Sequence, residues 1–245
     1  MREIEFEVLR YDPEQDQAPR FATYKVPCQE EWVVLDALTY IKDELDPSLA
    51  FRWSCHMAVC GSCGMQVNGK PTLSCKAFVK DFPDKVKVEP LANFPIERDL
   101  VIDMDDFMAK LQAGKPWIIP EQKRSLDDGP YQQSPEQLEA FKSFTLCINC
   151  MLCYAACPVY ALDRDFVGPA ALTLMHRYNT DNRDDGWSER RNMFAGHGGV
   201  WDCSFVGACS DVCPKHVEPA TALQLGKMDS ALDYFTSFVM PRGGK

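Results

Sequence analysis

Eleven of the chain's twelve cysteines lie in groups whose spacing suits iron–sulfur chemistry. The first group has the order Cys55-x4-Cys60-x2-Cys63 and is completed by Cys75, twelve residues further on. A [2Fe-2S] cluster needs four thiolates, and this is the spacing of the plant-type binding loop. The first group therefore predicts a [2Fe-2S] site held by these four cysteines.

Residues within the first group decide between rival kinds of site. Gly61 and Gly64 should adopt backbone torsions that other residues resist and let amide N–H groups approach the sulfides. A structural zinc site is the alternative, but zinc ligands usually come in C-x2-4-C pairs rather than three in one loop. His56 could be a Rieske-type ligand, yet four cysteines are already present, so we interpret His56 as a surface or second-shell residue.

The second group follows the pattern of bacterial two-cluster proteins, with one member missing. It begins as Cys147-x2-Cys150-x2-Cys153-x3-Cys157-Pro158 and continues as Cys203-x5-Cys209-x3-Cys213-Pro214. The full template, C-x2-C-x2-C-x3-C-P, requires a cysteine at position 206, where the chain has Val206. We expect each proline to end a local helix and turn the chain away from the cluster.

The fourth cysteine of each such run ligates the other cluster. This crossover rule predicts a [4Fe-4S] cluster on Cys147, Cys150, Cys153 and Cys213. The other site then has only Cys157, Cys203 and Cys209 beside an apolar valine, which favours a [3Fe-4S] cluster. A fourth iron held by water or a remote ligand is the alternative.

Composition limits the partners and the cellular compartment that are compatible with these sites. The chain has 245 residues, a net charge of −10 and a pI near 4.9, which argues against nucleic acid as a partner. No signal peptide and no apolar run long enough for a membrane-spanning helix are expected. Twelve cysteines could also indicate a secreted disulfide protein, but their close spacing favours clusters in a reducing compartment. Cys28 stands alone and is interpreted as a small buried apolar residue.

The N-terminal part reads as strands around one helix. Two alternating runs predict strands, one with Ile4, Phe6 and Val8 and one with Ala22, Tyr24 and Val26. A helix is expected over 34–45, a hairpin around the Asn-Gly pair at 68–69, and a last strand at 86–88. Strands and one helix without alternating βα units suit a small α+β domain.

The remainder reads as helices. One is expected over 100–111, followed by a loop over 114–133 that forms a joint or a surface excursion. Ser134, Pro135 and Gln137 form a helix-start signature. Further helices are expected from Pro169 to His176 and from Pro219 onward, the latter with Ala222, Leu225, Met228, Leu232 and Phe235 on one face. The predicted fold class is α+β: a β-grasp plant-type ferredoxin domain over 1–105 and an all-α bacterial-type ferredoxin domain over 106–245.

No covalent-haem, dinucleotide-binding or Walker sequence is evident. Iron–sulfur clusters move single electrons, whereas bond-making chemistry usually requires another cofactor. The chain is therefore expected to carry electrons between sites on other subunits.

This arrangement resembles the iron–sulfur subunit of the succinate dehydrogenase/fumarate reductase family. The resemblance covers nearly the whole chain and is closest to the bacterial quinol:fumarate reductase branch. It is carried by the segments RWSCHMAVCGSCG, PLANFPIERDLVIDM, CINCMLCYAACP, FVGPAALTLMHRYN and FVGACSDVCPKHVEP. Ubiquinone-reducing succinate dehydrogenases typically have Trp a few residues after the first CP and His after the first [3Fe-4S] cysteine of the downstream run. Here 159–162 reads VYAL and position 204 is Ser, which favours the menaquinol-oxidising branch.

The resemblance implies a flavoprotein partner that carries FAD and the dicarboxylate site. It also implies one or two membrane anchor subunits that bind menaquinone or ubiquinone, at the cytoplasmic face of the bacterial inner membrane. Electrons would pass from quinol through [3Fe-4S], [4Fe-4S] and [2Fe-2S] to the flavin. Gln224 and Lys227 fall at quinone-site positions, with a solvated helix face as the alternative. Succinate dehydrogenase running in reverse, a free-standing multi-cluster ferredoxin and a zinc-stabilised binding module are the alternative functions.

Overall fold

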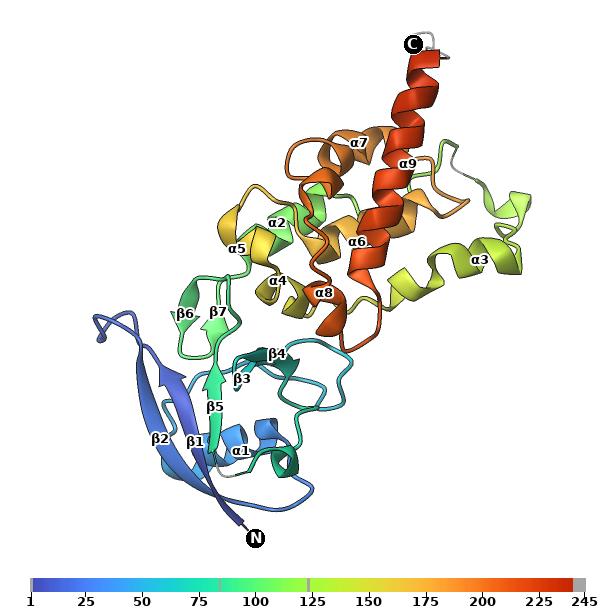
Figure 1. Ribbon diagram of the computed structural model, residues 1–245. Helices are drawn as coiled ribbons and strands as arrows, with labels where there is room; N and C mark the ends of the chain where they lie inside the picture. Colours follow the sequence, from blue (N-terminus) through green and yellow to red (C-terminus); the bar gives the residue numbers. More distant parts are fainter. Residues whose placement is uncertain (1, 84, 123, 240–245) are drawn as a thin grey trace. The chain divides into compact units, whose positions relative to one another are not determined.

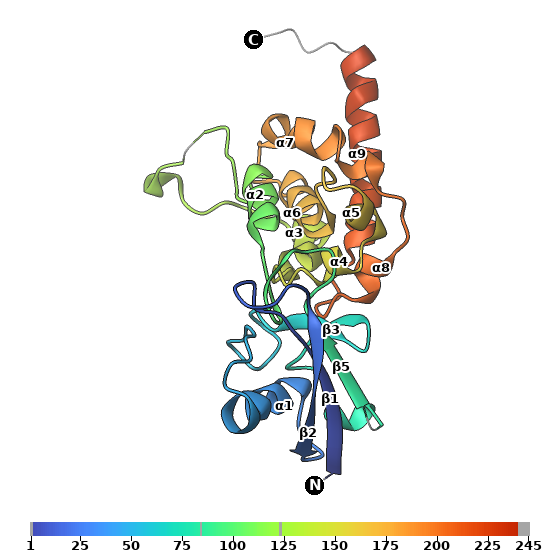
Figure 2. The same ribbon diagram turned by 90° about the vertical axis from the view of Figure 1, so that its left-hand side faces the viewer.

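The computed structural model of the protein describes residues 2–83, 85–122 and 124–239. Its contacts divide the chain into two compact units. Unit 1 comprises 1–106, 148–156 and 212–214, and unit 2 comprises 107–147, 157–211 and 215–245. Strands gather in unit 1 and helices in unit 2 (Figures 1 and 2), as the expected α+β order requires.

Unit 1 is built on a five-stranded sheet in the order β2-β1-β5-β3-β4. Its strands are β1 (Arg2–Arg10), β2 (Arg20–Cys28), β3 (Gly64–Val67), β4 (Lys70–Leu73) and β5 (Lys85–Glu89). β1 pairs with β2 antiparallel and with β5 parallel, while β3 pairs antiparallel with both β4 and β5. The β3–β4 turn confirms the hairpin prediction, since Asn68 and Gly69 have φ of 49° and 76°, as a type I′ turn requires.

The core of unit 1 lies under one face of this sheet. Ile4, Phe6 and Val8 point into it from β1, as their alternation predicts. They pack with α1 (Val34–Tyr40), which continues as the π-helical turn η1 (Ile41–Leu45). Unit 1 also contains η2 (Val79–Asp81), the ribbon of β6 (Ile96–Arg98) and β7 (Val101–Ile102), and the short helix α4 (Leu152–Ala155).

A buried charge pair fixes the segment that leads into the first cysteine group. Asp99 is 2% exposed and accepts hydrogen bonds from Arg10 Nε at 3.0 Å and from Tyr11 N at 2.9 Å. Its second oxygen accepts from Ala50 N at 2.8 Å. Arg10 also pairs with Asp46. Burial raises the pKa of the Asp46 carboxyl, but hydrogen bonds from Ser48, Tyr24 and Arg10 outweigh this effect and hold the pKa well below its usual value. The chain is therefore anchored five residues before Cys55.

Unit 2 is helical and centres on the packing of α6 against α9. Its helices are α2 (Asp105–Ala113, of which 107–113 belong to this unit), α3 (Pro135–Lys142), α5 (Pro158–Leu162), α6 (Pro169–Asn179), α7 (Trp187–Ala195), α8 (Ala208–Asp211) and α9 (Pro219–Val239). Short 3-10 turns are η3 (Leu126–Asp128), η4 (Ser143–Leu146) and η5 (Val200–Asp202). α3, α7 and η4 pack against α6, and α7, α8 and η5 pack against α9.

Helix starts follow the sequence in some places and depart from it in others. Ser134 caps α3 as predicted, since its Oγ accepts from Gln137 N at 3.2 Å and its N donates to Gln137 Oε1 at 2.8 Å. The helix expected over 100–111 begins only at Asp105, because Val101 and Ile102 form β7. Pro158 begins α5 instead of ending a helix, since proline lacks only an N–H that the first turn does not use.

The loop over 114–133 is a surface excursion within unit 2 whose first part is anchored by a buried arginine. Arg190 is fully buried and pairs with Asp184 at 2.6 Å, and it donates to the carbonyls of Trp117 at 2.7 Å and Lys115 at 3.1 Å. Leu126, further along the loop, is fully exposed.

The face of α9 expected from its apolar spacing is mostly exposed. Of its members only Ala222 is buried, whereas Leu225, Met228, Leu232 and Phe235 are exposed. Leu223, Gly226 and Ser230 face the body of unit 2 instead. Gly226 packs so closely against Phe194 that a Cβ on this glycine would lie 2.5 Å from the phenyl ring.

Candidate functional site

The first cysteine group forms a loop that directs amides at sulfur. Cys55 Sγ accepts backbone N–H groups from Met57 at 3.4 Å, Val59 at 3.3 Å and Cys60 at 3.3 Å. Cys60 Sγ accepts from Ser62 N at 3.5 Å. Hydrogen bonds of this kind stabilise thiolates and, in a loaded site, tune the cluster's reduction potential.

Left-handed backbone makes this loop possible. His56 and Ala58 both have φ of 56°, and Gly61 has φ of 76°. An alanine in this region is strained, and such strain persists only where the surrounding structure enforces it. Ala58 takes this conformation between Met57 and Val59, whose amides both donate to Cys55.

The four cysteines of the first group lie in different electrostatic surroundings. The amides of Met57, Val59 and Cys60 lower the pKa of the Cys55 thiol to about 6. Burial, followed by a hydrogen bond with Cys63, raises the pKa of Cys75 to about 12. These interactions bring Cys55, Cys60, Cys63 and Cys75 into one neighbourhood.

Gly61 and Gly64 do not play the same role. Gly61 has the expected positive φ, and a Cβ there would lie 2.9 Å from both Cys150 Cβ and Ile148 O. Gly64 has no positive φ, so the torsional expectation is wrong for it. A Cβ on Gly64 would instead lie 3.1 Å from Cys150 O and 3.3 Å from Leu152 and Leu91, so close packing explains this glycine.

His56 is a surface residue, as interpreted from the sequence. Its side chain is 45% exposed, and its Nε2 lies 2.9 Å from Asp36 Oδ1. Cys28 is 2% exposed and belongs to the apolar core of unit 1, again as expected.

The two runs of the second group share one backbone pattern. In the upstream run, Asn149 and Met151 have φ of 53° and 64°. In the downstream run, Phe205 and Gly207 have φ of 56° and 85°. These positions lie two and four residues after the first cysteine of each run, so Val206 occupies the place that Cys150 has upstream.

The contact units divide the second group unevenly. Cys150, Cys153 and Cys213 belong to unit 1, and Cys157, Cys203 and Cys209 belong to unit 2. Cys147 is the last residue of its segment of unit 2. Cys213 thus groups with two upstream cysteines, while Cys157 groups with the downstream ones.

Cys157, Cys203 and Cys209 line one pocket of unit 2, together with Val206. Burial, and then the charges of Cys157 and Cys203, raise the pKa of Cys209 to about 11. Val206 is 63% exposed and offers no ligand. The donor set therefore fits a cluster with three thiolates and one vacant corner.

The two residues suggested for a quinone site lie one turn apart on α9. Lys227 Nζ donates to the carbonyl oxygen of Cys203 at 2.8 Å. Lys227 is half-buried, so it does not lie on a fully solvated helix face. Gln224 Nε2 is buried and has no hydrogen-bond partner among the described residues.

Sequence reasoning missed the residue that holds α4. Asn93 Nδ2 donates to the carbonyls of Tyr154 at 3.0 Å and Ala155 at 3.1 Å, all within unit 1. These bonds satisfy carbonyls at the end of a helix that carries Cys153. The only sequence signal for Asn93 is its place in PLANFPIERDLVIDM, a segment without cysteine.

Within the described ranges, no helix is both long and apolar enough to cross a bilayer.

Family models match both parts of the chain. A 2Fe-2S iron-sulfur cluster binding domain matches residues 5–109, and a 4Fe-4S dicluster domain matches 143–217. These matches confirm a [2Fe-2S] site followed by a dicluster part.

Relatives match along the whole length. The fumarate reductase iron-sulfur subunit of Haemophilus influenzae is 54% identical over 97% of this chain and 96% of its own. The succinate dehydrogenase iron-sulfur subunit of Coxiella burnetii is 36% identical over 89% and 93%. A chain of the Mycobacterium smegmatis Sdh1 complex in the apo form superposes with a TM-score of 0.83 at 28% identity, covering 95% of this chain and 97% of that one.

Three observations agree on the same family: the order of the cysteine groups, the β-rich unit followed by a helical unit, and the relatives that match over nearly the whole chain. The chain belongs to the family of iron–sulfur subunits of fumarate reductase and succinate dehydrogenase, and it is a fumarate reductase iron–sulfur electron-transfer subunit.

Proposed function

We propose that the chain holds three clusters and carries single electrons between a quinol and a flavoprotein subunit that reduces fumarate. The ligands are Cys55, Cys60, Cys63 and Cys75 for [2Fe-2S], Cys147, Cys150, Cys153 and Cys213 for [4Fe-4S], and Cys157, Cys203 and Cys209 for [3Fe-4S]. The [2Fe-2S] domain spans 1–105 and the dicluster domain 106–245. The division of contacts at 106/107 supports this boundary for the main segments, whereas 148–156 and 212–214 group with the first unit.

The observation that carries the [3Fe-4S] assignment is the corner occupied by Val206. The backbone there repeats the turn around Cys150, yet the side chain is an exposed valine beside three cysteines. The grouping of Cys157 with Cys203 and Cys209 in one unit supports the crossover of ligands.

We assign the quinol end of the relay to α9. Lys227 connects this helix to the carbonyl of Cys203, which is one of the three cysteines. An ammonium group there can stabilise negative charge that develops on a bound quinone. The buried, unpartnered amide of Gln224 supplies a donor near it in sequence.

The direction of electron flow, from a quinol to a flavoprotein, implies the partners of the chain. A flavoprotein subunit with FAD receives the electrons, and one or two anchor subunits hold the chain at the cytoplasmic face of the inner membrane. The oxidation of menaquinol is favoured by Ser204 and the VYAL segment, and 54% identity to a fumarate reductase subunit against 36% to a succinate dehydrogenase subunit agrees with it.

The test is low-temperature EPR of the purified complex, oxidised and then reduced, in wild type and in Val206→Cys. Wild type should give the oxidised signal of a [3Fe-4S] centre and, on reduction, signals of one [2Fe-2S] and one [4Fe-4S] centre. Val206→Cys should lose the [3Fe-4S] signal and gain a second reduced [4Fe-4S] signal. Val206→Ala, which adds no thiol, should keep the wild-type spectrum.

Wild type without the [3Fe-4S] signal at full iron loading would reject the cluster assignment. An unchanged spectrum in Val206→Cys would reject position 206 as the vacant corner.

A further inference from the structure

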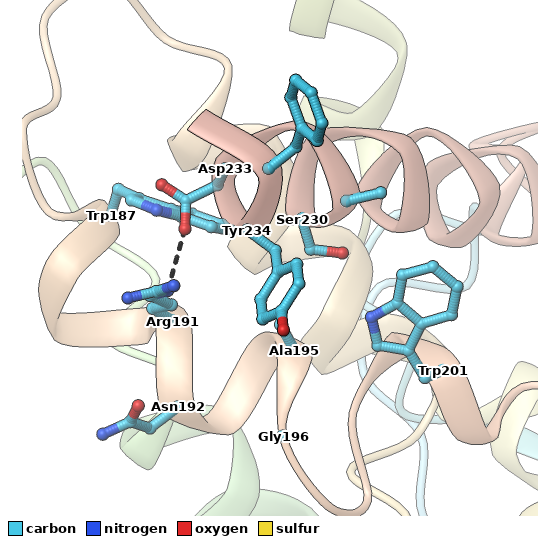
Figure 3. Close-up of a pocket in the computed structure, with 11 residues that line it drawn as sticks. Trp187, Arg191, Asn192, Ala195, Gly196, Trp201, Ser230, Asp233 and Tyr234 are labelled. Carbon is cyan, nitrogen blue, oxygen red and sulfur yellow. Dashed lines mark ion pairs between the residues drawn. The ribbon is translucent and has the colours of Figure 1, made fainter. Parts of the chain in front are cut away.

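A second pocket of unit 2 lies between α7, η5 and α9, away from the cysteines (Figure 3). Its volume is about 640 Å³, within the range of roughly 300–1,000 Å³ that ligand pockets occupy. The aromatic residues Trp187, Trp201, Tyr234 and Phe235 line it. Trp201, Tyr234 and Phe235 are more than half exposed, so the pocket opens to the surface.

One ion pair supplies the charge in this pocket. Arg191 Nε lies 2.8 Å from Asp233 Oδ2, and the pair bridges α7 and α9 (Figure 3). The Arg191 side chain is 44% exposed and that of Asp233 is 14% exposed. The lining thus offers one cation and one anion side by side, with aromatic faces that also attract a cation.

The apolar lining continues onto the end of α9. No described residue of this helix after Ser230 is buried, and Leu232, Phe235, Phe238 and Val239 are each more than half exposed. In both views this end of the helix projects beyond α6 and α7 of the same unit (Figures 1 and 2). A contiguous patch of large apolar side chains on this scale marks an interaction surface.

The chemistry of the pocket and of the exposed end of α9 indicates which ligand they bind. Tryptophan and tyrosine concentrate where a protein meets the headgroup layer of a bilayer, because each has an apolar body and a polar tip. An anionic headgroup would be opposed by the chain's net charge of −10. A zwitterionic headgroup matches the Arg191–Asp233 pair, its phosphate toward the guanidinium and its ammonium toward the carboxylate.

We propose that this pocket binds the headgroup of a zwitterionic phospholipid of the phosphatidylethanolamine type, with the acyl chains along Leu232, Phe235 and Phe238. This inference rests on the membrane location given under the proposed function. It adds a direct lipid contact by this chain that is separate from the cluster and quinone residues.

The experiment uses the whole complex reconstituted in bilayer discs with a trace of photoreactive phosphatidylethanolamine, which carries a diazirine near the glycerol. After illumination, digestion and mass spectrometry should locate adducts on 187–201 and 230–239. The same diazirine on phosphatidylglycerol should label these segments less. Arg191→Gln with Asp233→Asn should reduce the adduct yield about tenfold, equivalent to roughly 1.4 kcal/mol.

The matched control is Glu139→Gln with Lys142→Gln, which removes an exposed ion pair on α3 and should leave labelling unchanged. Equal or stronger labelling by phosphatidylglycerol, or equal labelling of the Arg191/Asp233 variant, would overturn the proposal. Lipid adducts confined to other subunits, with none on 187–201 and 230–239, would likewise overturn the proposal, because the lipid would then lie outside this pocket. EPR of the clusters in the same discs separates failure of this inference from failure of the proposed function.

Discussion

Gly61 packs directly against Cys150, so closely that a single added carbon would lie 2.9 Å from Cys150 Cβ. The contact joins the loop of the first cysteine group to a cysteine of the second, within unit 1. Glycine satisfies two requirements here, the positive φ of 76° and the absence of a side chain.

Gly61→Ala should destabilise unit 1 by roughly 3 kcal/mol, combining left-handed strain of about 1–2 kcal/mol with overpacking. For a chain of this size, the melting temperature should fall by about 6–12 °C. The control is Gly69→Ala, since Gly69 has the same φ of 76° with nothing within 4 Å. Thermal bleaching of the [2Fe-2S] absorbance measures both variants, and equal losses would contradict the packing argument.

Asp99→Ala should destabilise unit 1 by roughly 3–5 kcal/mol, because it breaks a buried ion pair and leaves Tyr11 N and Ala50 N without their acceptor. The loop before Cys55 should loosen first, so [2Fe-2S] content should fall while the other clusters persist. Quantitative EPR after expression measures this. Glu139→Ala, in an exposed pair with Lys142, should change stability by less than about 1 kcal/mol. If all three clusters are lost in parallel in Asp99→Ala, the local anchoring role is wrong.

His176 should make unit 2 sensitive to acid. It is 2% exposed, and neither ring nitrogen has a hydrogen bond among the described residues. Burial lowers the pKa of His176 to about 4 from an ordinary value of 6.5. The unfolded chain therefore binds a proton that the folded chain does not, so stability falls as pH drops from about 6.5 to about 4, by up to roughly 3 kcal/mol.

His176→Phe preserves the ring packing against Phe144 and Phe194 and should flatten the melting temperature over this pH range. Asp229 lies 3.5 Å from His176 Nδ1, and burial raises the pKa of its carboxyl, so its contribution has the opposite sign. Asp229→Asn should therefore steepen the acid loss. A wild-type slope retained in His176→Phe would exclude this histidine as its source.

Lys227→Met should slow quinol oxidation about tenfold or more if the proposed quinone site is correct, because it removes the ammonium group beside the negative charge that develops as the quinol is oxidised. Fumarate reduction driven by an artificial electron donor should be nearly unaffected. Lys227→Arg should retain more quinol activity than Lys227→Met, and Lys142→Met on the exposed face of α3 is the matched control. A parallel loss of both activities in Lys227→Met would indicate a structural role through Cys203.

Features encoded by neighbouring residues could be predicted from the sequence. The hairpin at Asn68 and the cap at Ser134 each depend on spacing within a few residues. Residues that act over long sequence separations could not be found in this way. Asn93 binds carbonyls 61 and 62 residues away, and Arg190 binds carbonyls 73 and 75 residues away. Their roles exist only once the chain has folded.

At the repeated turn around Cys150 and Val206, the course of the backbone and the presence of a cysteine ligand are determined independently. Both segments follow the same backbone course, although only one of them presents a thiol. Under the proposed ligand sets, the number of irons at this site is decided by one side chain without any rearrangement of the main chain. A single codon change could then alter the potential of one centre while leaving the fold and the other two centres in place, so this corner is a point at which the relay is readily adjusted in evolution.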